Sequence, residues 1–151
     1  MTFYYINSAP QWKSFNGGNW KNLEITIRKE ALERNVRLSV YTGTHETLRL
    51  NNRVITLGSS GKMPVPLYFW KVVTEKKTGE GIAFVGVNDP FNLYQLLCPD
   101  ICNQITWLGN FGELRKRQNS GIVYCCSIES LKRIPNIVLP EFQQYTGGIL
   151  D

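Results

Sequence analysis

Two apolar segments near the middle of the chain constrain its fold more than any other feature. Residues 67–73 and 82–87 are rich in β-branched and aromatic residues, which favour extended strands. Between them, residues 78–81 have the sequence Thr-Gly-Glu-Gly, which is typical of a turn. The sequence therefore predicts an antiparallel β-hairpin, and with it a sheet to which the hairpin belongs.

Helical periodicity is clearest in residues 19–34. Apolar residues recur there at helical spacing, at Trp20, Leu23, Ile27 and Ala31. Asn19 follows a Gly-Gly turn, so we expect it to act as the N-cap. Glu24 and Arg28 lie at the edge of the apolar stripe rather than on the opposite, solvated face. A carboxylate this close to the buried face of a helix needs a structural or functional explanation.

The remaining segments are shorter and complete a mixed fold. Strands are predicted at residues 36–41, 47–50, 53–57 and 122–126, and helices at residues 101–108 and 128–134. With 151 residues and 42% hydrophobic content, the chain is long enough to bury a core. We therefore expect a single α+β domain over residues 1–151, with helices packed on a mainly antiparallel sheet.

The charge balance favours an anionic partner. Lys and Arg number 17 against 12 Asp and Glu, giving a net charge of +5. Part of the excess lies in three clusters at residues 76–77, 115–117 and 132–133, which could track the phosphates of a nucleic acid. An ordinary solvated surface gives the same pattern, so charge alone does not identify the partner.

Neither a membrane-spanning segment nor an export signal is visible in the sequence. No apolar run approaches the ~20 residues that a membrane-spanning helix needs, so we expect no membrane partner. The first residues lack the basic and apolar regions of a signal peptide.

The four cysteines, Cys98, Cys102, Cys125 and Cys126, are grouped in the C-terminal half, as in many disulfide-bonded secreted domains. The adjacent Cys125 and Cys126 cannot readily bridge each other. Full pairing would therefore join each to Cys98 or Cys102, which leaves two connectivities open. Reduced, buried cysteines are the alternative. A zinc site is disfavoured because adjacent ligands in a strand point to opposite faces.

A group of polar residues surrounds the start of the predicted helix. An Asn-x-x-Pro-Gln element runs from Asn7 to Gln11, and Asn16 follows shortly before the helix. Within the helix, Glu24 and Arg28 stand at i and i+4 and share one face. Taken alone, this spacing is equally typical of an ordinary helix ion pair.

Together these residues resemble the DNA/RNA non-specific endonucleases, which have the ββα-metal or His-Me finger fold. In that family the Asn just ahead of the helix binds Mg²⁺, the Glu of Trp-x-x-Leu-Glu holds the water shell of the ion, and the following Arg stabilises the phosphate. The resemblance thus implies Asn16 as a direct ligand of Mg²⁺ or another divalent cation, Glu24 as a ligand through water, and Arg28 as a catalytic group. It also implies that Asn7 lies near the scissile phosphate.

The implied site agrees with the coordination chemistry of the ion. Mg²⁺ keeps several of its waters and accepts one or two protein oxygens, so an amide oxygen and a carboxylate acting through water form a sensible minimal site. The resemblance also places Gln11, Lys13 and Arg28 against the nucleic acid, with DNA and RNA as partners. It allows a homodimer.

The resemblance covers nearly the whole chain, including residues 69–73, 84–88, 101–108 and 121–126 in family order. His45 is the single histidine of the chain. It matches a Thr-Gly-Thr-His turn of the family and not the catalytic histidine, so we expect it to be a loop residue without a catalytic role.

One family motif is missing. Family members carry Asp-Arg-Gly-His ahead of the Asn-x-x-Pro-Gln element, and its histidine is the general base that activates water. We therefore expect an N-terminally truncated domain, with the first β elements, the base and any signal peptide upstream. For the full-length parent we expect secretion, with a mitochondrial location, as in endonuclease G relatives, as the alternative.

Three functional hypotheses follow. The first is a Mg²⁺-dependent endonuclease acting on DNA and RNA, inactive or weakly active as this chain. The second is a non-catalytic nucleic-acid-binding remnant. The third is a secreted, disulfide-stabilised interaction domain.

Overall fold

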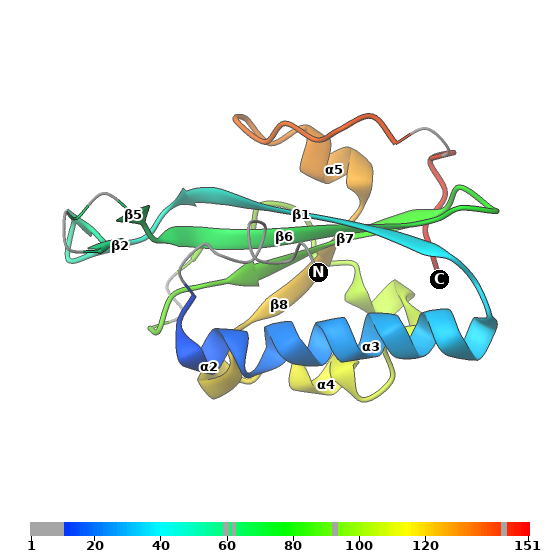
Figure 1. Ribbon diagram of the computed structural model, residues 1–151, viewed down its shortest axis with the longest axis horizontal. Helices are drawn as coiled ribbons and strands as arrows, with labels where there is room; N and C mark the ends of the chain where they lie inside the picture. Colours follow the sequence, from blue (N-terminus) through cyan, green and yellow to red (C-terminus); the bar gives the residue numbers. More distant parts are fainter. Residues whose placement is uncertain (1–10, 59–60, 62, 92–93, 143–144) are drawn as a thin grey trace.

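The computed structural model of the chain describes residues 11–58, 61, 63–91, 94–142 and 145–151. Its centre is a four-stranded antiparallel sheet with the order β1-β6-β7-β8 (Figure 1). The strands are β1 (Leu38–Thr47), β6 (Pro66–Glu75), β7 (Gly81–Val87) and β8 (Val123–Cys126). The predicted hairpin is confirmed as β6 and β7, which occupy the middle of the sheet.

Helices cover both faces of this sheet. On one face lie α2 (Lys13–Asn16), α3 (Asn19–Arg34) and α4 (Phe111–Leu114), and on the other lies α5 (Ile128–Lys132) (Figure 1). In the described part of the chain, short 3-10 helices are η1 (Cys102–Gln104), η2 (Thr106–Leu108) and η3 (Gln118–Ser120). The α+β prediction is confirmed. Within the described ranges, no helix combines the length and the apolar character needed to cross a membrane.

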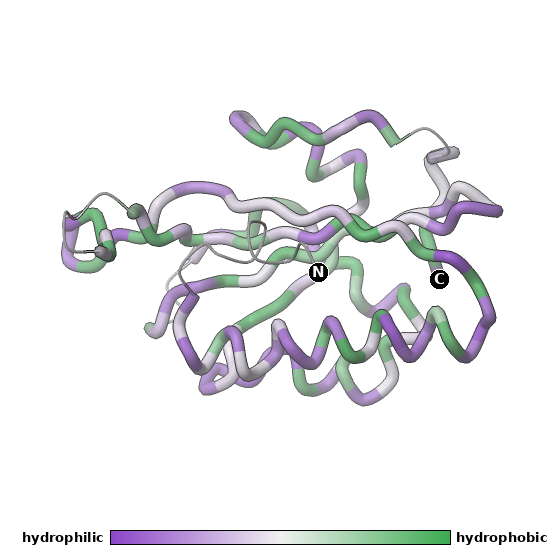
Figure 2. The backbone as a smooth tube through the Cα atoms, viewed as in Figure 1, coloured by the Kyte–Doolittle hydropathy of each residue, from purple (hydrophilic) through white to green (hydrophobic). Residues whose placement is uncertain are grey.

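The core consists of two apolar layers, one on each face of the sheet. Because side chains alternate along β6, Phe69 and Val73 point towards α3 while Tyr68, Trp70 and Val72 point towards α5. Both faces of β6 and β7 are covered, which explains their nearly continuous apolar sequence. Figure 2 shows the contrast with α3, where hydrophilic and hydrophobic segments alternate along the helix.

The first strand is longer than predicted. Residues 36–41 and 47–50 were expected as separate strands with a turn between them, but β1 runs without interruption through Gly43 to Thr47. The indole of Trp70 lies over Gly43 so closely that a β-carbon there would collide with it. The glycine that suggested a turn is therefore required by packing inside a strand.

Short strand pairs follow β1. They are β2 (Arg49–Leu50) with β3 (Arg53–Val54), and β4 (Thr56–Leu57) with β5 (Met63–Pro64). The strand predicted at residues 53–57 is thus divided between two pairs.

The helices outside α3 also differ from prediction. Residues 101–108 form the two turns η1 and η2, because Ile105 between them has extended backbone angles (φ −108°, ψ 101°). The helix predicted at residues 128–134 is shorter and begins after Ser127, whose hydroxyl accepts a hydrogen bond from the Ser130 amide at 3.1 Å. Neither α2 nor α4 was predicted, since four-residue helices carry little periodicity.

Two disulfides fasten η1 and the segment just before it to β8. Cys98 pairs with Cys126 and Cys102 pairs with Cys125, with Cα–Cα distances of 5.8 and 4.9 Å. The expectation that each of the adjacent cysteines joins a different partner is confirmed. Because successive residues of β8 face opposite sides, one disulfide packs in each apolar layer.

A zinc site at the cysteines is excluded in the described part of the chain. Asp100, Cys102 and Cys125 bring potential ligand atoms within 4.8 Å of one another. Both sulfurs belong to the same disulfide, however, and the Asp100 carboxylate accepts hydrogen bonds from the Cys102 and Cys125 amides at 3.1 and 3.2 Å. This cluster is therefore structural.

Gly86 is expected to tolerate no side chain. A β-carbon at this position would lie 2.6 Å from ring atoms of Phe15 and 2.7 Å from Trp20. We expect Gly86→Ala to lower the free energy of unfolding by about 1–3 kcal/mol, as overpacked cores do. Gly112→Ala in α4 is the matched control, because open space surrounds its β-carbon. Urea unfolding of both variants tests this packing, and equal stabilities would contradict it.

Candidate metal and nucleic-acid site

The corner between α2 and α3 holds the predicted metal ligand Asn16 in a fixed position. Asn16 is the last residue of α2 and is exposed. Gly18 then passes so close to η3 that a β-carbon would lie 2.5 Å from the Ser120 carbonyl oxygen. A glycine is therefore required at the turn that presents Asn16 to solvent.

Asn19 fixes the same corner from the other side. It was expected to be the N-cap, but Gly18 occupies that position and Asn19 is the first helical residue. The side chain of Asn19 is buried and donates hydrogen bonds to the carbonyl oxygens of Leu114 and Gly121, at 2.7 and 2.6 Å. The prediction was wrong because the amide serves long-range contacts in place of the local cap.

Glu24 is held against the sheet by a lysine that sequence reasoning missed. Its carboxylate lies 3.3 Å from the Nζ atom of Lys71 in β6, with side-chain exposures of 38% for Glu24 and 5% for Lys71. The same Nζ atom lies 4.9 Å from the ring centroid of Trp20. Glu24 therefore sits at the edge of the apolar stripe because its partner comes from the sheet below.

The alternative of an ordinary ion pair between Glu24 and Arg28 is not what the structure shows. Arg28 is exposed, and among the described residues it forms no ion pair. A single lysine inside the otherwise apolar run of residues 67–73 was the available signal for the true partner.

The electrostatics of Lys71 follow from this position. Burial lowers the pKa of Lys71 below its ordinary value, and the neighbouring Glu24 carboxylate opposes that shift without cancelling it. The lysine is thus anchored by one half-exposed carboxylate and one aromatic face. This arrangement limits the directions in which Glu24 can point.

The other predicted site residues are placed as follows. Lys13 is the first residue of α2 and is exposed, while Gln11 is partly buried just ahead of it. Arg28 lies one helical turn beyond Glu24 on α3. Asn7 lies outside the described residues. Lys13 and Asn16 therefore lie on α2, and Glu24 and Arg28 lie on α3, the next helix of the chain.

The basic clusters do not form one continuous surface. Residues 76–77 lie in the β6–β7 turn, at the end of the sheet away from α2, and residues 132–133 lie at the end of α5 on the other face (Figure 1). Arg115 is buried and pairs with Asp100 at 2.7 Å, so the idea that it tracks phosphates is wrong. Lys116 and Arg117 remain exposed, just before η3, which packs against α2.

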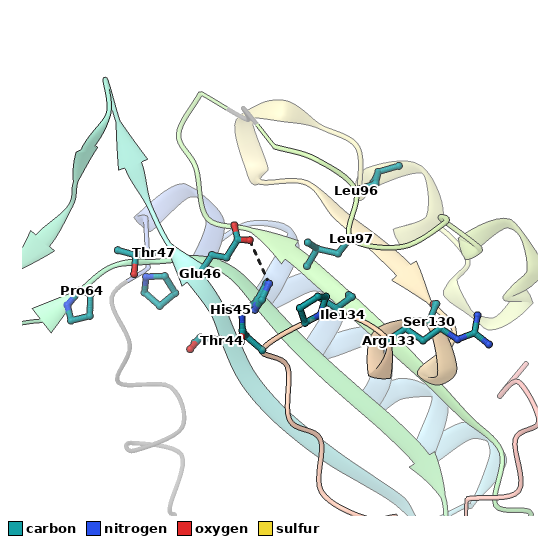
Figure 3. Close-up of a pocket in the computed structure, with 13 residues that line it drawn as sticks. Thr44, His45, Glu46, Thr47, Pro64, Leu96, Leu97, Ser130, Arg133 and Ile134 are labelled. Atoms are coloured by element: carbon teal, nitrogen blue, oxygen red, sulfur yellow. Dashed lines mark ion pairs between the residues drawn. The ribbon is translucent and has the colours of Figure 1, made fainter.

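A large cavity lies apart from these residues. It has a volume of about 760 Å³ and is lined by His45, Glu46, Arg133 and Ile134, among others (Figure 3). His45 pairs in register with Tyr68, whose side chain belongs to the apolar layer on the α5 side. The sheet thus separates this cavity from α3. His45 is also a buried strand residue and not the loop residue that we expected.

Comparison with known proteins agrees with the sequence motifs. The model of the DNA/RNA non-specific endonuclease family matches residues 1–131. The chain is 33% identical over 145 residues to a salivary endonuclease of Lutzomyia longipalpis, covering 93% of this chain and 35% of that protein. It is 30% identical over 140 residues to the salivary protein Tsal1 of Glossina morsitans morsitans, covering 87% of this chain and 34% of that protein.

A salivary endonuclease of Culex quinquefasciatus is 34% identical over 90 residues, which cover 58% of this chain and 24% of that protein. The chain spans about a third of the length of the first two relatives. No solved structure shows significant similarity to it. Because the family model covers most of the sequence, the chain belongs to the DNA/RNA non-specific endonuclease family.

Proposed function

We propose that the α2–α3 corner is a divalent-metal site at which phosphodiester bonds of DNA and RNA are hydrolysed, with Mg²⁺ as the ion. The observation that carries this proposal is the half-exposed Glu24 carboxylate, which Lys71 anchors on the helix that directly follows the exposed Asn16. An amide oxygen and a carboxylate are ligands that suit Mg²⁺. The salivary endonucleases among the relatives support the same activity.

Each residue has a distinct task in the proposed mechanism. The amide oxygen of Asn16 would hold the ion directly, and the Glu24 carboxylate would orient its water shell. A bound ion would neutralise charge on the phosphate and on the departing oxygen. The exposed guanidinium of Arg28 would donate hydrogen bonds to the phosphate, while Lys13 and Gln11 would contact the flanking backbone. Asn7 would lie near the scissile phosphate.

The general base is the missing part of this set. Among the described residues, the imidazole of His45 lies on the face of the sheet opposite α3. Among these residues, no histidine is therefore available at the corner to activate water. Because a general base contributes a factor of about 10²–10⁴, we expect slow cleavage by this chain and faster cleavage by a longer form that supplies one.

An extracellular location fits the proposal best. Two disulfides are typical of proteins that fold in an oxidising compartment. The relatives are salivary proteins by name, which favours secretion over the mitochondrial alternative.

Arg28→Gln is expected to reduce nuclease activity about 10–100-fold. Hydrogen bonds to charged groups contribute about 1.5–3 kcal/mol, which converts to this range. Lys29→Gln is the matched control, because Lys29 is the next residue of the helix and its side chain is 70% exposed. Cleavage of plasmid DNA with Mg²⁺ and with EDTA would be measured in the longest natural form of the protein that contains this chain.

Three outcomes decide between the hypotheses. Metal-dependent cleavage that falls in Arg28→Gln and not in Lys29→Gln supports the proposed enzyme. Salt-sensitive DNA binding without cleavage favours the non-catalytic remnant. Absence of both cleavage and binding supports the interaction domain.

Lys71→Met is expected to weaken metal binding while leaving the stability of the fold nearly unchanged, because Lys71 positions Glu24. The free energy of unfolding should change by no more than about 1 kcal/mol, because an ion pair with a half-exposed carboxylate contributes about that much or less. The affinity for Mg²⁺, measured as the ion concentration at half-maximal cleavage, should weaken about 10–100-fold, as when groups that orient metal ligands are removed. An unchanged metal affinity would show that Lys71 does not position Glu24.

A further inference from the structure

We infer that a second pocket beside α2 binds an unpaired nucleobase next to the scissile phosphate. This pocket has a volume of about 310 Å³, and its lining includes Trp12, Ser14, Asp89, Phe91, Gln118 and Asn119. The inference rests on the proposed function, because that function brings the nucleic acid to this corner of the molecule.

Two large aromatic side chains are exposed at this pocket. Trp12 is 37% exposed and Phe91 is 67% exposed, while Phe15, which also lines the pocket, is buried. Aromatic rings gain by leaving water, so their exposure at one pocket calls for a ligand with an apolar face. A nucleobase has such a face, and stacking on aromatic side chains tolerates any base. A sequence-independent nuclease needs that tolerance.

The backbone around both aromatic residues is fixed. The Trp12 amide donates a hydrogen bond to the side chain of the buried Asn88 at 2.8 Å, and Asn88 in turn donates to the Pro66 carbonyl oxygen at 2.9 Å. The Phe91 amide donates to the Asp89 carboxylate at 2.8 Å. The two side chains therefore project from backbone that is already held by hydrogen bonds. This reduces the conformational entropy lost when a base stacks on them.

The pocket adjoins the proposed metal site. The Asn16 amide donates a hydrogen bond to the Trp12 carbonyl oxygen at 2.8 Å, so the two residues are one turn of α2 apart. Four residues of helix correspond to about 6 Å, a distance that a phosphate and a neighbouring base of one strand can span. A strand whose phosphate lies at Asn16 can therefore place a neighbouring base at Trp12.

The side chains that line the pocket favour binding of a base over binding of a phosphate. Asp89 is the one ionisable side chain among the described residues of its lining, and a carboxylate repels phosphate. Carboxylate and amide groups hydrogen-bond the edges of bases, and the exposed residue Asn119 adds an amide. Exposed cations lie outside it, at Lys13 on α2 and at Lys116 and Arg117 before η3, where they suit the backbone of the same strand.

Binding of a short fluorescein-labelled oligodeoxyadenylate in EDTA tests this inference without requiring cleavage. We expect Trp12→Ala and Phe91→Ala each to weaken the affinity about tenfold, within the range measured for loss of a base–aromatic stack. Trp12→Phe should retain most of the affinity because it keeps an aromatic face. Leu32→Ala is the control, because Leu32 is an apolar residue of α3 that is 81% exposed and absent from the pocket lining.

An abasic oligomer of the same length makes the test specific. Wild type and Trp12→Ala should bind it equally, since no base remains to stack. Equal affinities of wild type, Trp12→Ala and Phe91→Ala for oligodeoxyadenylate, or no binding by the wild type, would overturn the inference. Trp12-dependent binding without cleavage by the longest natural form of the protein would keep the pocket and refute the proposed nuclease. Cleavage that depends on Asn16 but is unchanged in Trp12→Ala and Phe91→Ala would support the proposed nuclease and refute the base-binding pocket.

Discussion

Asn16→Ala is expected to reduce Mg²⁺-dependent cleavage about 10²–10³-fold. In the proposed site the Asn16 amide oxygen is the direct protein ligand, and an ion that neutralises phosphate charge contributes several kcal/mol to transition-state stabilisation. Asn16 is exposed at the end of α2, so its replacement should leave the fold intact. Initial cleavage rates over a range of Mg²⁺ concentrations give the measurement.

Asn110→Ala is the control for this variant. Asn110 is also an exposed asparagine beside a short helix, and its side chain makes no capping hydrogen bond in α4. We expect it to cleave at the wild-type rate. Equal rates for wild type and Asn16→Ala would remove Asn16 from the site.

Loss of the Cys102–Cys125 disulfide is expected to lower the free energy of unfolding by about 2–5 kcal/mol, as removal of native disulfides from small domains does. Both cysteines are buried in the apolar layer below α3, and the bond closes a loop with a sequence separation of 23. It also fixes the backbone whose amides contact Asp100. Denaturant unfolding of a Cys102→Ser/Cys125→Ser double variant tests this.

A reductant provides the internal comparison. It should lower the stability of the wild type below that of the double variant, because the Cys98–Cys126 disulfide is then lost as well. A variant with all four cysteines replaced should not respond to the reductant. A wild type that is insensitive to reduction under unfolding conditions would contradict the pairing.

The sequence predicted the elements whose periodicity is strong. The helix was predicted at residues 19–34 and α3 has these bounds, since its buried face is marked by Trp20, Leu23 and Ile27. The hairpin of β6 and β7 was visible because both of its faces are buried. The pairing rule for Cys125 and Cys126 held because successive strand residues face opposite sides.

Other features depend on contacts between residues that are distant in the sequence. From the sequence alone Gly43 suggests a turn, but in the structure the indole of Trp70 lies over it within a strand. From the sequence alone Asn19 suggests an N-cap, but its side-chain amide donates hydrogen bonds to the carbonyl oxygens of Leu114 and Gly121. Such contacts override local propensity, and no single-sequence pattern records them.

In the candidate site, too, some residues were predicted from the sequence and others depend on contacts between distant segments. Asn16, Glu24 and Arg28 were predicted through family resemblance, and the structure places them on connected helices. Lys71 was missed because its partner lies 47 residues earlier in the numbering, on another element. Arg115 was taken for a surface charge because its sequence neighbours are basic, although Asp100 holds it inside the protein.

Direct binding of Mn²⁺ tests the central claim, which is that the α2–α3 corner is a divalent-metal site. Electron paramagnetic resonance reports free Mn²⁺ during titration into the 151-residue chain. We expect one bound ion in the wild type, displacement by excess Mg²⁺, loss of binding in Asn16→Ala and wild-type binding in Asn110→Ala. No binding by the wild type, or equal binding by wild type and Asn16→Ala, would contradict this claim.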